Sequence, residues 1–228
     1  MKLNWETLYV ILFKTLYTVL LILMIMTLVK IIKKVNKTNE LFKIYFCYIF
    51  FILTNLFCTF FSFSESNFKF LLFITFELIL LASINKVITP DKILKNIVYL
   101  FFLLTYILAF IIFSIINKHI IYVLISVSTS LICMNYFNDI KNKLNTKFIL
   151  QNPKTIIILG LFFCYGVTFP VDVTAAYLHY INKINLTTVS KNTDDIISNI
   201  YDKVAYLEIL SYFILNFSIN KSLNFTEK

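Results

Sequence analysis

Seven apolar runs, most of them long enough to cross a lipid bilayer, divide the chain of 228 residues and leave short polar segments between them. A helix needs about 20 apolar residues to cross the hydrocarbon layer. The predicted spans cover residues 8–29, 44–63, 70–84, 96–116, 120–138, 155–181 and 204–219. We therefore expect an all-α, polytopic integral membrane protein, a seven-transmembrane-helix bundle in which residues 1–228 form a single transmembrane domain.

The composition agrees with lipid as the main solvent of this chain. Hydrophobic residues make up 59% of it and charged residues 14%, whereas soluble globular chains carry about 25% charged residues to face water. The net charge of +9 arises from lysine clusters between the apolar runs, and all 21 basic residues are lysines. Bidentate recognition of phosphate or bases by arginine is thereby excluded. We expect the lipid bilayer, and not nucleic acid, as a partner.

The distribution of lysines in short loops predicts the orientation of the bundle, because cytoplasmic loops carry an excess of positive charge. Fourteen lysines fall in alternate loops on one side and in the carboxyl-terminal tail, and six fall on the opposite side. The N-terminus is then outside and the C-terminus cytoplasmic. The first run is too long for a signal-peptide core, so we expect a multi-pass protein of a bacterial-type cytoplasmic membrane that keeps this span.

Four ionisable residues fall inside predicted spans, where such residues are costly and mark functional sites or structural pairs. Glu77 lies near the membrane midplane, and Asp172, Glu208 and Lys14 lie in the outer halves of their spans. At 1.5 Å per residue they lie about 8 to 14 Å below the outer surface, which predicts an outward-facing polar cavity for a ligand or ion. The alternative is structural: Lys14 extends to the surface, and each acid accepts hydrogen bonds from a nearby Ser, Thr or Tyr.

The segment FFCYGVTFPVDVTAAYLHY, residues 162–180, concentrates residue types that are rare in this chain. Pro170 removes the helical hydrogen bond to the carbonyl of Gly166, which predicts a helix kink at these two residues. Asp172 and His179 are seven residues apart and share one helix face, so His179 joins the candidates for the cavity. With two histidines in the chain, no multi-histidine metal site is expected.

No recognisable catalytic constellation occurs in the sequence, and we expect a non-enzymatic protein without metal or cofactor. The four cysteines lie in apolar runs without metal-ligand spacing, and the seventh predicted span holds no lysine for a retinal Schiff base. Motifs of intramembrane proteases are absent, and two glycines cannot form a phosphate-binding loop. Acid–base chemistry by Glu77, Asp172 and Glu208 is the enzymatic alternative that stays open.

The segments FELILLA, residues 76–82, and NPKTIIILGLFFCYG, residues 152–166, resemble uncharacterised bacterial seven-transmembrane inner-membrane proteins of about this length. The resemblance implies the heptahelical topology and no particular activity.

The leading hypothesis for function is a sensory or signalling module, which detects a solute in the outer cavity and passes a helix movement to a separate cytoplasmic partner. The alternative is a small transporter or channel, proton-coupled through Glu77, although discontinuous helices in matching halves, the usual mark of transporters, are not evident. A third reading is an accessory subunit of a membrane complex that acts by homo-oligomerising.

Overall fold

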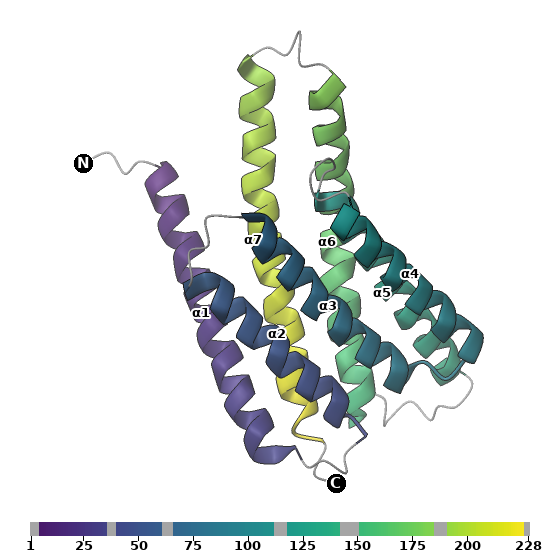
Figure 1. The fold of residues 1–228 in the computed structure, drawn as a ribbon. Coiled ribbons are helices and arrows are strands. Elements are labelled where there is room, and N and C mark those ends of the chain that lie inside the picture. The colour runs from purple at the N-terminus through teal and green to yellow at the C-terminus, as the bar shows by residue number, and fades with distance from the viewer. Residues whose placement is uncertain are drawn as a thin grey trace.

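The computed structural model describes residues 5–35, 40–60, 66–111, 118–141, 151–184 and 191–225. Within these ranges the chain forms seven α-helices and no strand, so the prediction of an all-α fold is confirmed. Their bounds are α1 Trp5–Lys34, α2 Phe42–Phe60, α3 Ser66–Ile88, α4 Lys92–Ile111, α5 Lys118–Lys141, α6 Pro153–Ile184 and α7 Lys191–Ser222. Successive helices run in opposite directions along the bundle (Figure 1).

Five of these helices are long and apolar enough to cross a membrane, which supports a multi-pass membrane protein. They are Ile11–Lys34, Phe68–Ile88, Lys92–Ile111, His119–Lys141 and Pro153–Leu178. A shorter apolar helix covers Phe42–Thr54. Residues 204–219, the seventh predicted span, belong to α7 but are not among the five, so the count of seven spans stays a prediction.

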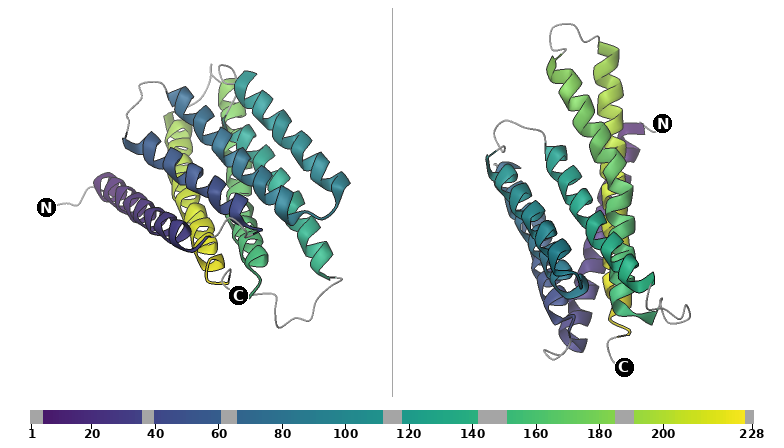
Figure 2. Two further views of the ribbon diagram at one scale, coloured as in Figure 1. Left: turned by 60° about the horizontal axis from the view of Figure 1, so that its bottom comes forward. Right: turned by 90° about the vertical axis from the view of Figure 1, so that its right-hand side faces the viewer.

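The helices form two layers, with α1 along one edge (Figures 1 and 2). The first layer consists of α2, α3 and α4, and the second of α5, α6 and α7. The pair α4 and α5 joins the layers at one edge, and α1 contacts both α2 and α7 at the other. The paired helices α6 and α7 extend beyond the others at the upper end (Figure 1).

Large aromatic side chains fill the lower part of the space between the layers. Tyr45, Tyr48 and Phe51 of α2 are at most 1% exposed. Tyr45 Oη lies 2.9 Å from Ser222 Oγ, and Tyr48 Oη donates to Asn216 Oδ1 at 2.8 Å. A buried phenol is stable in an apolar interior when its hydroxyl has a partner, so these contacts allow tyrosine to fill the core between α2 and α7.

A close approach of α6 to α7 depends on a glycine. A Cβ at Gly160 would overlap Cβ and Oγ of Ser218 on α7, whereas a Cβ at Gly166 would meet nothing within 4 Å. Small residues at such contacts let membrane helices pack closely. α6 is one continuous helix through Gly166 and Pro170, and the kink proposed at these residues stays a prediction.

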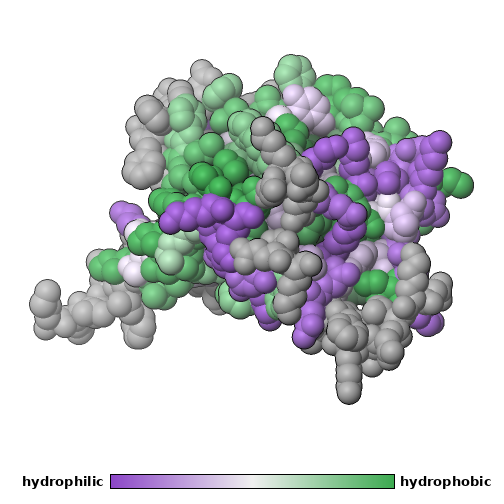
Figure 3. Space-filling view, turned by 90° about the horizontal axis from the view of Figure 1, so that it is seen from below, coloured by the Kyte–Doolittle hydropathy of each residue, from purple (hydrophilic) through white to green (hydrophobic). Residues whose placement is uncertain are grey.

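The side chains on the exterior of the bundle are apolar along its sides, as in contact with lipid, and hydrophilic at its lower end, as in contact with water. On α4, for example, Leu100 and Phe110 are each 66% exposed. Hydrophilic side chains gather at the lower end (Figure 3). Lysines at the helix ends located there come from all seven helices: Lys30, Lys33, Lys34, Lys43, Lys86, Lys92, Lys95, Lys141, Lys154 and Lys221. The lysine-rich helix ends thus share one end of the fold, as the predicted alternation of loops requires.

Candidate functional site

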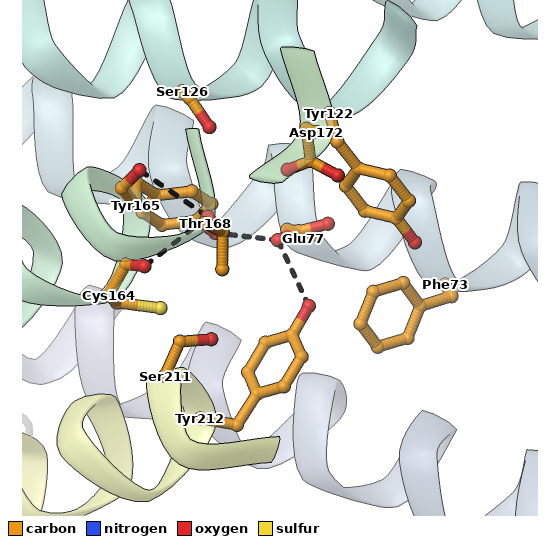
Figure 4. A pocket seen from close by; sticks show the side chains of 10 residues that line it. All are labelled: Phe73, Glu77, Tyr122, Ser126, Cys164, Tyr165, Thr168, Asp172, Ser211 and Tyr212. Carbon is orange, nitrogen blue, oxygen red and sulfur yellow. Dashed lines mark hydrogen bonds between the residues drawn. The ribbon is translucent and has the colours of Figure 1, made fainter. Parts of the chain in front are cut away.

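A cavity of about 210 Å³ lies between α3, α5, α6 and α7 (Figure 4). Its ten lining residues are Phe73, Glu77, Tyr122, Ser126, Cys164, Tyr165, Thr168, Asp172, Ser211 and Tyr212. Four of them are aromatic, two are acidic, and the others carry a hydroxyl or a thiol. The lining therefore combines apolar ring surface with several oxygen atoms, inside a bundle whose exterior is apolar.

Helical spacing explains how these residues come to face the same cavity. Side chains three, four or seven positions apart lie on one face of a helix. That spacing relates Phe73 to Glu77 on α3, Tyr122 to Ser126 on α5, and Tyr165 to Thr168 and Asp172 on α6. Each of α3, α5 and α6 thus turns one face to the cavity, and α7 contributes the adjacent residues Ser211 and Tyr212.

Glu77 lies at the midpoint of α3 and is 1% exposed. Its Oε1 accepts a hydrogen bond of 2.6 Å from Tyr165 Oη and a longer one of 3.5 Å from Tyr212 Oη. Burial of a carboxylate is unfavourable unless hydrogen bonds and opposite charge compensate for the lost water. For Glu77, the structural alternative considered from the sequence, hydrogen bonding to tyrosine, is present in the fold.

Asp172 on α6 pairs with a histidine that the sequence analysis did not consider. Asp172 is 2% exposed, and its Oδ1 lies 3.2 Å from Nδ1 of His119 on α5. This contact becomes an ion pair when the imidazole is protonated. The sequence positions carried a signal for this pairing. His119 is the second residue of α5, and Asp172 lies in the second half of α6. Because α5 and α6 run in opposite directions (Figure 1), these positions lie in the same half of the bundle.

Ser126 places a hydroxyl in the cavity that no described residue satisfies. The residue is 1% exposed, and its Oγ has no hydrogen-bond partner within the described part of the chain. In Figure 4 the hydroxyl points towards the middle of the lining residues. The neighbouring Ser128 and Thr129 donate instead to carbonyls four residues earlier in α5, which is the usual arrangement for hydroxyls in helices.

The structure brings together two of the five residues predicted to form the cavity, Glu77 and Asp172. Lys14 is exposed on α1 and is not among the lining residues. His179 belongs to α6 and Glu208 to α7, but their side chains lie outside the described part of the structure. The role of these residues in binding a ligand or ion stays a prediction.

The sequence did not identify the tyrosines of the lining as site residues, because aromatic residues are too frequent in this chain to mark a site. With 25 phenylalanines and 14 tyrosines in the chain, nearly every helix has aromatic positions on several faces. Tyr122 and Tyr212 stand out only when their helices are oriented around Glu77 and Asp172 (Figure 4). An acid at helical spacing from an aromatic residue, as for Phe73 and Glu77, was the one local signal.

Among the residues that the structure describes, no group of three or more His, Cys, Asp or Glu side chains is placed to hold a metal ion. Comparison of the chain with protein-family models, curated proteins and solved structures gives no match. The resemblance to uncharacterised bacterial heptahelical proteins therefore stays a prediction.

Proposed function

We propose that this protein is a seven-span sensory or accessory subunit of a bacterial-type cytoplasmic membrane, and that it binds a small solute in the cavity between α3, α5, α6 and α7. The observation that carries the proposal is the lining itself, in which the carboxyls of Glu77 and Asp172, three tyrosines and the buried hydroxyl of Ser126 line one cavity. Small-molecule sites are concave, mostly apolar, and contain a few polar groups that orient the ligand.

The helices that line the cavity also reach the lysine-rich end, which supports a sensory role. α6 and α7 both contribute lining residues and both continue to the lower end of the bundle (Figure 1). They touch closely at Gly160 and Ser218, below the cavity. A solute that changes the separation of α6 and α7 would therefore move Lys154 and Lys221, where a partner protein with acidic side chains would dock.

Affinity purification of the full-length protein from native membranes, with mass spectrometry of bound solutes and proteins, tests this proposal. We expect one solute to co-purify with the wild type and with Tyr136→Phe, which alters a buried tyrosine outside the cavity lining. Glu77→Gln should lose the solute and change the yield of a co-purified protein. If the wild type carries no solute and the three proteins recover the same partners, the proposal is wrong.

The proposed topology can be tested separately by labelling the two ends of one helix. Lys69 and Lys86 lie near opposite ends of α3, so the topology assigns Lys69 to the outside and Lys86 to the cytoplasm. A membrane-impermeant maleimide added to intact cells should label Lys69→Cys and not Lys86→Cys, with the wild type as the blank. The reverse labelling pattern would refute this orientation, and equal labelling would refute α3 as a span.

A proton-coupled transporter is the second candidate, and one arrangement favours it. The titratable groups Glu77, Asp172 and His119 follow one another from the middle of the bundle towards its upper end. Such series of titratable groups inside membranes serve proton relays. Proteoliposomes should then acidify in response to a pH gradient with the wild type and respond less with Glu77→Gln. Equal acidification by both proteins would rule out this version of the function.

A further inference from the structure

We infer that the solute of the cavity is a small organic ammonium ion that carries a hydrogen-bonding group. This inference rests on the proposed function and adds the chemical class of the ligand. Three properties of the lining lead to it: the sign of its charged groups, the number of aromatic rings, and the buried hydroxyl of Ser126.

The charged groups of the lining favour a cation. Two of the ten lining residues are acidic and none is basic. His119, next to Asp172, supplies positive charge on that side when it is protonated. Two hydrogen bonds to Glu77 Oε1 come from the phenols of Tyr165 and Tyr212, which are neutral donors. An anionic solute would place a second negative charge near Glu77 in a low-dielectric interior, whereas a cation near Glu77 lowers the unfavourable free energy of burying the carboxylate.

The aromatic rings favour an alkylated cation over a metal ion. Phe73 and Tyr212 meet at 87° with their centroids 5.9 Å apart, so the two rings form a corner. Tyr122 and Tyr165 add further ring surface to the lining (Figure 4). Ring faces attract ammonium groups, and alkyl groups on nitrogen also gain contact with the rings. Hard metal cations instead require several oxygen ligands in a defined geometry.

The hydroxyl of Ser126 and the cavity volume further restrict the chemical class of the solute. Because Ser126 Oγ is buried without a partner among the described residues, an N–H or hydroxyl group on the solute would satisfy it. The cavity of about 210 Å³ is smaller than the roughly 300–1,000 Å³ of sites that take drug-sized ligands, which favours a small solute. Choline, a small solute with a hydroxyl and a trimethylammonium group, is a suitable probe.

Equilibrium binding of choline to the purified full-length protein in detergent tests the inference without any mutation. The control is 3,3-dimethylbutan-1-ol, which has nearly the same shape as choline and no charge. We expect choline to bind, and the neutral alcohol to bind with an affinity at least about tenfold lower. Acetate and potassium ions should not compete with choline for the site. Equal binding of the alcohol, competition by acetate or potassium, or no binding of choline would each overturn the inference.

Three variants locate the binding site. Glu77→Gln should weaken choline binding by about tenfold or more, and Tyr212→Leu by about tenfold, because each removes one attractive group. Tyr212→Phe keeps the ring and should change the affinity by less than about threefold. Tyr136→Phe, outside the lining, should bind like the wild type. If Glu77→Gln elutes as aggregate, the comparison of Tyr212→Leu with Tyr212→Phe decides, and equal affinities would overturn the inference.

The inference and the proposed function fail in different ways. If mass spectrometry identifies an anionic or uncharged solute whose retention depends on Glu77, the ammonium ligand is wrong and solute binding in the cavity stands. If the wild type retains no solute and does not bind choline, both are wrong.

Discussion

The lower interior of the bundle and the cavity above it use the same residue type with opposite results. In the lower interior, Tyr45 and Tyr48 each meet one small polar side chain of α7, and the space is filled. In the cavity, Tyr165 and Tyr212 both donate to Glu77 and line a space of about 210 Å³. In this fold, the tyrosines with separate partners lie in the packed region, and the tyrosines that share one carboxyl line the cavity.

The largest effect is expected at the helix contact that defines the packed region. Gly160→Ala places a methyl group on Ser218, and such overpacking should lower the free energy of unfolding by about 1–3 kcal/mol. Gly166→Ala on the same helix meets open space and should leave stability unchanged or raise it by up to about 1 kcal/mol. Unfolding by SDS in mixed micelles, followed by circular dichroism, measures both. Equal effects of the two alanines would contradict the difference in packing.

A smaller effect should separate the tyrosines of the two regions. Tyr48→Phe leaves Asn216 Oδ1 without its buried donor and should lower the free energy of unfolding by about 1–2 kcal/mol. Tyr212→Phe removes only the long bond to Glu77 Oε1, so we expect a change below about 0.5 kcal/mol. The same SDS titration compares them. If Tyr212→Phe is the more damaging variant, the cavity is stabilised like the packed core and the contrast fails.

The serines of the two regions provide a third comparison. Ser126→Ala removes a buried hydroxyl that has no partner among the described residues, so it should leave the free energy of unfolding unchanged or raise it by up to about 1 kcal/mol. Ser222→Ala, in the packed region, takes the partner of the Tyr45 hydroxyl and should lower stability by about 1 kcal/mol. Ser126→Ala should nevertheless weaken choline binding. If the Ser126→Ala protein is stable and binds choline with wild-type affinity, the assignment of Ser126 to the binding site is wrong.

The smallest effect is expected outside the spans, at the lower end, where Lys154 Nζ lies 2.6 Å from Glu40 Oε2. The hydrogen bond and charge of Lys154 lower the pKa of Glu40 below its usual 4.5. A carboxyl whose pKa is lower in the folded protein stabilises the fold at any pH above its pKa in the unfolded chain. This contribution disappears as the pH falls through the pKa of the folded state. Glu40→Gln should therefore lower the melting temperature slightly at neutral pH and not in strong acid. A deficit that persists in high salt would contradict an exposed ion pair.

The extent of the helices shows what could be read from hydropathy. The predicted span 155–181 lies within α6, Pro153–Ile184, and the span 70–84 lies within α3, Ser66–Ile88. These two helices are longer than their apolar runs because helical hydrogen bonding continues through polar residues at the ends, where hydropathy no longer reports it. Lys69 and Lys86 are examples on α3.

The partners inside the bundle could be predicted only in part. Glu77 and Asp172 were identifiable because an acid in an apolar run stands out whatever its neighbours are. The pairing of Asp172 with His119, and the convergence of Tyr165 and Tyr212 on Glu77, depend on the rotation and depth of four helices. A sequence pattern gives the face of each helix, but it does not say which faces meet.

The sequence by itself determined that the chain is helical, apolar along its sides, and basic at one end, because these properties follow from local hydropathy and the order of lysine clusters. Only the tertiary structure decided that α6 and α7 touch at Gly160 and Ser218 and that four helices leave a cavity around Glu77 and Asp172. The physical reason is that such contacts depend on how side-chain volumes fit between helices. That fit is a property of pairs of helices, and no single segment contains it.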